Sequence, residues 1–239
     1  MVNLIRSEWI KFRSVRSTLI TLLLAGGLVV LIGVIAANDA ANDFPPIRLT
    51  ELTPGVSIAA LIFGALGVQV LGQEYRFNTI RPTFTAMPRR GRVLVAKLIV
   101  VTLACAAISV LMVGFCWLIG SAMIDGFETD GVDQRAALGI VLFSMGWSAL
   151  GMGLGAIVRQ PIAGILILLA EAFVVENIVS NLVPSLSKWM PFLNGFRMTL
   201  RDEDFDNQYQ SVLGGGIYFF AVAAAVWVLG AFLATRRDA

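Results

Sequence analysis

The chain has 239 residues, of which 57% are apolar and only 14% are charged, and its formal net charge is +2. A typical soluble domain has about 25% charged residues, and the mean hydropathy of +0.81 is too high for a water-soluble globule. These values argue against a soluble enzyme, a disordered regulator and a nucleic-acid-binding domain, and they favour a membrane protein.

Six apolar runs are long enough to cross a bilayer, which takes about 20 residues of helix. We expect spans over residues 18–37, 55–73, 98–124, 136–158, 161–183 and 212–235. The predicted fold class is an all-α membrane protein, with residues 1–239 forming a single transmembrane domain. The first run is longer than the apolar core of a signal peptide, which has about 7–15 residues, so we expect an uncleaved span.

The distribution of lysine and arginine orients these spans. Thirteen basic residues fall before span one, between spans two and three, after span four or at the C-terminus. Five fall in the connections on the other side, namely Arg48, Arg135, Lys188, Arg197 and Arg201. Because basic residues accumulate on the cytoplasmic side of a membrane, we expect both termini in the cytoplasm.

Residues 2–14 predict an amphipathic helix that lies at the membrane surface before the first span. Ile5, Trp9 and Phe12 share one face of a helical wheel. The pattern is imperfect, because Glu8 falls on this apolar face. Two interpretations are open: a surface anchor, or a docking element in which Glu8 pairs with a basic residue of a partner or of the next loop.

The cytoplasmic connection 74–97 contains the signals of a short helix. Asn78 and Thr79 are suited to cap a helix, Pro82 fits near its start, and Pro88 would end it. We therefore expect a short amphipathic helix here, in a connection too small to be a catalytic domain.

This connection also combines a basic cluster with apolar side chains. Contact with anionic lipid headgroups explains the basic residues Arg89, Arg90 and Arg92. It does not explain the apolar side chains, which are Phe77, Ile80, Phe84 and Met87. These residues predict an apolar tip that contacts a protein partner.

The order of residues in the connection resembles the cytoplasmic coupling region of ABC-2-type transporter permeases. The resemblance rests on Glu74, Thr79, Ile80, Arg81, Pro88, Arg90 and Lys97. Asn78 stands where the family usually has glycine, and asparagine tolerates left-handed backbone angles better than most residues. The N-terminal stretch 6–14 and the six spans with both termini inside extend the resemblance over the full length.

The resemblance implies a small permease that pairs with a second permease chain and docks two separate ATPase subunits. ATP and Mg would be held by the partner ATPase, and this chain has no G-x-x-x-x-G-K-[ST] phosphate-binding loop. The candidate coupling residues are Glu8, Trp9, Phe12, Glu74, Arg76, Thr79, Arg81, Phe84 and Arg90. We expect no cofactor on this chain and no nucleic-acid partner.

Two carboxylates, Glu171 and Glu176, fall within the fifth expected span. Intramembrane carboxylates are costly and usually face a cavity or a partner, so both are candidates for a translocation path or an inter-subunit contact. Five residues correspond to about 140° around a straight helix, on which the two cannot both face one cavity, although a break in the helix would change this. The alternatives are a solvated or capping role for Glu176 and a paired structural role for Glu171.

Two further segments have structural interpretations. Gly151 and Gly155 form a G-x-x-x-G pattern in the fourth span, which permits close helix contact. The external connection 184–211 is expected to include a re-entrant or surface-lying helical segment. It either gates the release of substrate or is a solvated loop.

Several absences limit the chemistry. There is no histidine, and the acidic stretch that begins at Asp202 lacks the glycine and the glutamate of a calcium loop. Cys105 and Cys116 lie in one apolar run and are expected to be packing residues. We therefore expect no metal site and no catalytic residue.

The leading hypothesis is the membrane subunit of an ATP-binding-cassette exporter for an amphiphilic substrate, such as a peptide, an antibiotic or a lipid. One alternative is a secondary transporter driven by an ion gradient, with Glu171 as the coupling group. Another is a sensory subunit that binds a ligand without transporting it. The use of Arg, Ala, Gly and Val is typical of a GC-rich bacterium, so we expect a bacterial plasma membrane.

Overall fold

The computed structural model describes residues 1–40, 48–86, 89–201 and 211–237. Apart from one isolated β-bridge between Arg48 and Glu128, the regular elements of these residues are helical. The α-helices are α1 (Val2–Ser14), α2 (Arg16–Ala40), α3 (Val56–Arg76), α4 (Ile80–Ala86), α5 (Arg90–Met123), α6 (Gly131–Val158), α7 (Pro161–Ala170), α8 (Glu176–Leu182), α9 (Pro191–Arg197) and α10 (Val212–Arg237). Three short elements are η1 (Leu49–Leu52), the π-helical turn η2 (Glu171–Val175) and η3 (Pro184–Trp189).

Six helices of the described residues are long and apolar enough to cross a membrane, as the sequence predicts. They are α2, α3, α5, α6, the continuous stretch α7–η2–α8, and α10. A spanning segment is helical because lipid offers its backbone no other hydrogen-bond partner. The third spanning helix begins at Arg90 rather than at residue 98, so Arg92 and Lys97 lie in its first turns and not in a loop.

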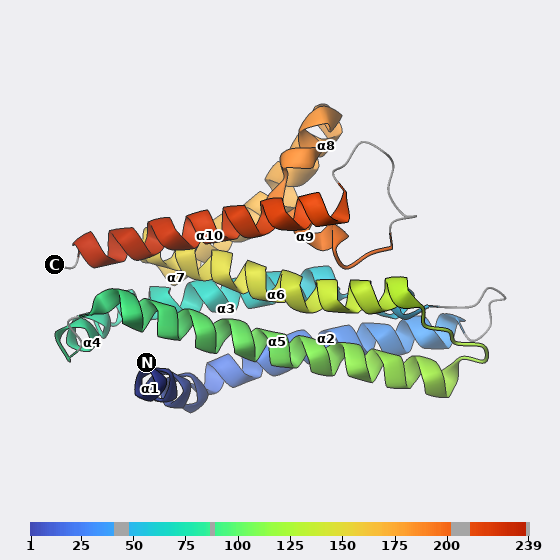
Figure 1. Cartoon of the computed structure of the whole chain (residues 1–239), viewed down its shortest axis with the longest axis horizontal. Helices are drawn as coiled ribbons and strands as arrows, with labels where there is room; N and C mark the ends of the chain where they lie inside the picture. The colour runs from blue at the N-terminus through green and yellow to red at the C-terminus, as the bar shows by residue number, and fades with distance from the viewer. Residues whose placement is uncertain (41–47, 87–88, 202–210, 238–239) are drawn as a thin grey trace.

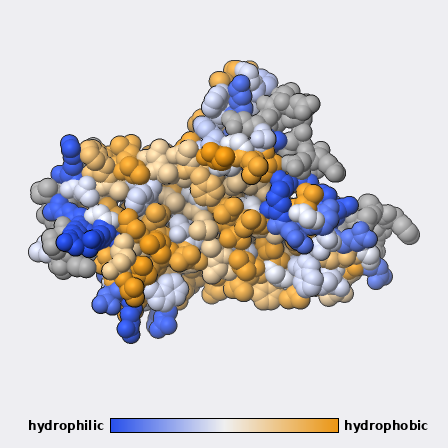
Figure 2. Space-filling model, in the orientation of Figure 1, coloured by the Kyte–Doolittle hydropathy of each residue, from blue (hydrophilic) through white to orange (hydrophobic). Residues whose placement is uncertain are grey.

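The helices run side by side, with both termini at one end of the bundle (Figure 1). This end also holds α1 and α4, and we call it the basic end because most lysine and arginine residues lie there. The opposite end holds the α5–α6 connection, and α9 lies towards this end. A broad apolar band separates two more hydrophilic ends on the face shown in Figure 2.

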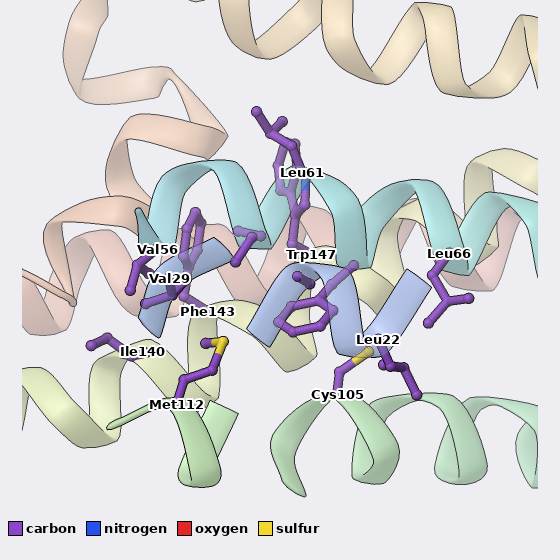
Figure 3. Packing of buried hydrophobic residues seen from close by; sticks show 14 of the residues in the cluster. Leu22, Val29, Val56, Leu61, Leu66, Cys105, Met112, Ile140, Phe143 and Trp147 are labelled. Atoms are coloured by element: carbon purple, nitrogen blue, oxygen red, sulfur yellow. The ribbon is translucent and has the colours of Figure 1, made fainter. Parts of the chain in front are cut away.

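The centre of the bundle is a close contact between α3 and α6. A Cβ atom on Gly151 would lie 2.0 Å from Gly64 O, and one on Gly155 would lie 2.5 Å from Val68 O. The G-x-x-x-G pattern therefore packs against α3 of the same chain, where only glycine lets two backbones approach so closely. Trp147 and Phe143 of α6 fill the adjoining core with side chains from α2, α3 and α5 (Figure 3).

An ion cluster joins three connections at the opposite end. Asp130 caps the first turn of α6 and accepts hydrogen bonds from Arg48 Nη1 at 2.7 Å and Arg201 Nη2 at 2.9 Å. Arg201 Nη1 also donates to Asp133 Oδ1 at 3.1 Å. We call these four residues the Asp130 clasp. The hydrogen bond from Arg201 holds the pKa of Asp130 well below its usual range.

The α3–α6 contact predicts a large effect from a single side chain. Gly151→Leu places atoms where the backbone of Gly64 now lies, so we expect it to lower stability by about 1–3 kcal/mol or to abolish folding. Gly114→Leu makes the same change at a glycine of α5 with nothing within 4 Å and should leave the unfolding temperature nearly unchanged. Thermal unfolding of both variants in detergent tests this, and equal unfolding temperatures would contradict it.

The Asp130 clasp predicts a loss of stability in acid. Because the pKa of Asp130 is lowered by folding, its contribution is present above the unfolded pKa of about 3.9 and is lost as pH falls through the lower folded value. Asp130→Asn keeps a capping side chain but not the charge. We expect the difference in unfolding temperature between wild type and this variant to shrink from pH 7 to pH 3. A difference that stays constant over this pH range would contradict the role of the clasp.

Candidate functional site

Three charged side chains from three helices meet inside the basic end. Lys97 Nζ, in the second turn of α5, lies 2.5 Å from Glu8 Oε2 of α1 and 2.6 Å from Glu74 Oε1 of α3. The side chains of Lys97 and Glu8 are 4% exposed, and that of Glu74 is 16% exposed. We call these three residues the ion triad. It brings together two of the candidate coupling residues, from elements more than sixty positions apart in the sequence.

A fourth charge extends the ion triad towards solvent. Lys11 Nζ donates a hydrogen bond to Glu8 Oε1 at 2.8 Å, and its side chain is 49% exposed. Burial raises the pKa of Glu8, but the ammonium groups of Lys97 and Lys11 lower it by more, so the pKa lies below its usual value. Glu8 is therefore ionised at neutral pH.

The ion triad also sets how α1 faces the bundle. The buried side chains of α1 are Leu4, Glu8 and Phe12. Trp9 was expected on the same face as Phe12, but it is 46% exposed. The helix turns its Glu8 side inward because Lys97 has to be compensated there, and this requirement overrides the purely apolar pattern.

The predicted apolar tip of the 74–97 connection is largely wrong. Ile80 and Phe84 of α4 are buried within the chain, against a cluster that includes Val93 and Leu94 of α5. Phe77 alone of the described tip residues is well exposed, at 65%. The amphipathic pattern was recognised correctly, but the apolar face of α4 covers α5 instead of projecting into water.

The turn before α4 has the geometry that its sequence suggested. Asn78 has φ of 54°, in the left-handed region that asparagine tolerates. The turn brings Thr79 N within 3.0 Å of Glu74 O, beside the ion triad. The cap suggested by Asn78 and Thr79 thus closes the end of α3 as well as leading into α4.

Two arginines of the candidate coupling set lie on aromatic rings. The guanidinium of Arg76 is 5.6 Å from the ring centroid of Phe77, and that of Arg90 is 5.4 Å from the ring centroid of Phe84. Arg90 also donates a hydrogen bond to Thr235 O at 3.1 Å and so joins α5 to the end of α10. Arg90 therefore stabilises the arrangement of helices at the basic end, whereas the contact of Arg76 with Phe77 is local to the end of α3.

The carboxylates of the fifth span lie closer together than a straight α-helix would allow. The π-helical turn between them has the backbone hydrogen bond from Glu176 N to Glu171 O, five residues apart, which brings residues i and i+5 to one side. Their carboxyl groups are within hydrogen-bonding reach of each other. The limit expected for a straight helix therefore does not apply here, because the π-turn is the kind of break that changes it.

Glu176 also holds the external helix α9 in place. Its carboxyl oxygens accept hydrogen bonds from Phe192 N at 2.6 Å and Leu193 N at 2.8 Å. These are N–H groups of the first turn of α9, which have no partner within that helix. Glu176 is 1% exposed, so it is a buried cap and not a solvated residue.

Several candidate residues fall outside the described structure. They are the side chain of Arg81, residues Met87 and Pro88, and the acidic stretch from Asp202. Among the described residues, no group of three or more cysteine, aspartate or glutamate side chains is arranged to hold a metal ion.

Lys97 belongs to the ion triad but was not among the candidate coupling residues predicted from the sequence. It appeared only as part of the family resemblance, as the lysine that opens the third span. A lysine directly before a long apolar run was the available signal, because an ammonium at that depth needs a carboxylate partner.

Six spanning helices, with an amphipathic helix joined to their basic end by buried ions, define a multi-pass membrane protein. The sequence profile of the ABC-2 family transporter proteins matches residues 4–186, from α1 into η3. The chain therefore belongs to the ABC-2 transporter family, which confirms the resemblance seen in its sequence, and the family implies partnership with ABC ATPase subunits. No curated protein matches the chain in sequence.

The ion triad predicts an ordered series of stability changes. Lys97→Met leaves Glu74 without its counter-charge and Glu8 with only the half-exposed Lys11, so we expect a loss of about 3–5 kcal/mol. Glu8→Gln should cost less, because Lys97 still pairs with Glu74. Lys11→Met should cost less than about 1 kcal/mol, because Lys11 is half-exposed. Thermal unfolding of the three variants in detergent measures the order of their losses in stability.

A neutral version of the ion triad provides the control. The triple variant Glu8→Gln/Glu74→Gln/Lys97→Met buries no unpaired charge and should recover much of the stability lost in Lys97→Met. If Lys97→Met were as stable as Lys11→Met, the ion triad would not hold the basic end together.

Proposed function

We propose that the chain is the membrane permease subunit of an ABC exporter. Separate ATPase subunits bind ATP and Mg and hydrolyse the nucleotide, and this chain couples that reaction to the export of an amphiphilic substrate such as a peptide, an antibiotic or a lipid. A second permease chain completes the pathway. The complex lies in a bacterial plasma membrane with the basic end in the cytoplasm, in keeping with the excess of lysine and arginine there.

The observation that carries this proposal is the ion triad. It joins α1, which lies before the first span, directly to α3 and α5. A force on α1 from the cytoplasmic side would therefore displace the two spanning helices α3 and α5, since separating α1 from them would expose or unpair a buried charge. An element that transmits movement needs this kind of rigid connection.

The contact surface for the ATPase is the exposed side of the same region. With Ile80 and Phe84 buried, the exposed apolar side chains that remain there include Trp9, Ile10 and Phe77. Basic residues surround them on α1 and at the start of α5. A few large aromatic side chains within a charged rim are typical of protein interfaces.

The translocation path is proposed to involve the fifth span and its two carboxylates. The α7–η2–α8 stretch diverges from the other helices towards its α8 end (Figure 1), and most of its exposed side chains are apolar, including Leu166, Phe173 and Ile178. A second permease chain would cover part of this surface, with Glu171 near the path between the two. Glu176 would then join movement of this span to α9.

The contact between Glu171 and Glu176 favours one alternative function, a transporter driven by an ion gradient. Such a carrier needs an ionisable group within the membrane, and this span has two carboxyl groups in apolar surroundings. Flux in liposomes without ATPase subunits, abolished by Glu171→Gln, would establish this alternative and exclude the exporter. Flux that requires the ATPase and ATP would do the reverse.

The proposed docking surface predicts that Trp9 contributes to binding of the ATPase. Trp9→Ala should weaken retention of the ATPase at least tenfold when the tagged chain is purified from its native membrane. This is the effect expected for an aromatic side chain that becomes buried in the interface with its partner. Trp117→Ala is the matched control, since Trp117 has the same 46% exposure but lies near the other end of α5. Quantitative mass spectrometry of the co-purified ATPase is the measurement.

Coupling can be separated from docking with a second variant. Glu8→Gln leaves Trp9 in place, so the ATPase should still bind, but transport per ATP hydrolysed should fall several-fold. A complex that never contains an ATPase, or in which Trp9→Ala and Trp117→Ala behave alike, would contradict the proposal.

A further inference from the structure

A cavity of 550 Å³ lies beside the ion triad, between α1, the start of α2, α3 and α5. Glu8, Lys11, Glu74 and Lys97 all line it. The lining extends along α3 from Gln69 to Glu74, about 7.5 Å of helix axis. Its size is that of a ligand site, since such sites enclose about 300–1,000 Å³.

One polar atom of this cavity lacks a partner. Glu74 Oε1 pairs with Lys97, but Glu74 Oε2 is buried and accepts no hydrogen bond from any described residue. A buried carboxylate oxygen without a donor is unfavourable. The cavity therefore favours a ligand that brings a hydrogen-bond donor, above all a cationic one, to this oxygen.

The charges around the cavity alternate along a row. Starting from Glu74, the row continues through Lys97 and Glu8 and ends at Lys11. One end is thus the free carboxylate oxygen, and the other is a half-exposed ammonium group. Because the four charges sum to zero, the row is complementary to a zwitterion and not to a ligand with net charge.

The remaining walls are those of a site at a membrane interface. Val70, Val100 and Val101 line the cavity on the side of the spanning helices. Gln69, Gln73 and Thr18 add amide and hydroxyl groups to the lining. Charged, polar and apolar side chains thus share one cavity, as the headgroup, glycerol esters and acyl chains of a phospholipid require.

We propose that this cavity binds a phospholipid whose zwitterionic headgroup has a primary ammonium, as phosphatidylethanolamine does. The lipid ammonium donates a hydrogen bond to Glu74 Oε2, and the phosphate contacts Lys11. The acyl chains leave past Val70 towards the hydrocarbon. The site adjoins the proposed docking surface, since Phe77 also lines the cavity, but binding at it does not require ATP or the ATPase.

The headgroup series on the wild-type chain is the first test. The full-length, delipidated protein in detergent is titrated with phosphatidylethanolamine, phosphatidylcholine or phosphatidylglycerol of identical acyl chains, and the first bound lipid is quantified by native mass spectrometry. Phosphatidylcholine has methyl groups in place of the N–H donors. We expect phosphatidylethanolamine to bind about tenfold more tightly than either of the others.

Two variants and one control assign the binding to this cavity. Glu74→Gln should reduce the preference for phosphatidylethanolamine over phosphatidylcholine to less than about threefold. Val70→Phe fills the apolar part without changing a charge and should weaken both lipids about tenfold. Ile58→Phe makes the same kind of change at an exposed position of α3 outside the cavity lining and should have no effect. Should Glu74→Gln not fold, Val70→Phe and the wild-type series still decide.

Three results would overturn the proposal. Equal affinity for phosphatidylethanolamine and phosphatidylcholine would mean that Glu74 Oε2 does not select the ammonium. Tightest binding of phosphatidylglycerol would indicate an anion site. Binding of soluble glycerophosphoethanolamine as tightly as the lipid would mean that the ligand is a free phosphodiester and not a component of the bilayer.

Discussion

The arrangement of the basic end depends on how one buried ammonium group is compensated. Lys97 is 4% exposed, and removing either carboxylate partner from such a group is strongly destabilising. Its two partners come from α1 and α3, so neither helix can slide along α5 without breaking an ion pair. Amphipathicity alone would let α1 lie anywhere on a membrane surface, whereas the ion triad gives it one position and one rotation. The contacts of α4 and of the Asn78 turn then form around helices that are already fixed.

The rigid connection continues from the ion triad to the opposite end through backbone contacts. Helix α3 meets α6 at Gly151 and Gly155, and α6 meets α10 where Gly153 lies against the backbone of Trp227. The first turn of α6 in turn holds the Asp130 clasp. Such glycine contacts leave little room for one helix to move independently of the next. The α2, α7–η2–α8 and α10 spans bury a smaller share of their surface than α3 and α6, so relative movement is easier at these outer spans than between α3 and α6.

The sequence was sufficient for the features that the bilayer determines and insufficient for those that tertiary contacts determine. The number of spans follows from hydropathy, because each must satisfy its own backbone, and the left-handed turn at Asn78 follows from a local preference of asparagine. The positions of Ile80 and Phe84 could not be inferred, because an amphipathic helix that packs on its own chain has the same periodicity as one that packs on a partner. Whether Glu171 and Glu176 share one side of their span could not be decided, because a π-turn has no distinctive spacing in the sequence. The partner of Glu8 was among the possibilities stated, but its identity as Lys97 required the fold.

The ion triad and the lipid cavity are physically linked, which bears on how membrane composition enters the proposed transport cycle. The charged row ends on α3 at Glu74 and on α1 at Lys11. A ligand whose ammonium and phosphate contact both ends binds best at one relative position of these two helices. A ligand shifts a conformational equilibrium only by its difference in affinity for the two states. The lipid would therefore stabilise the state in which α1 and α3 lie as they do here, and movement of α1 would change its affinity by the same factor. In this view the phospholipid acts from the membrane side on the contact between α1 and α3, and the ATPase acts on the same contact through α1.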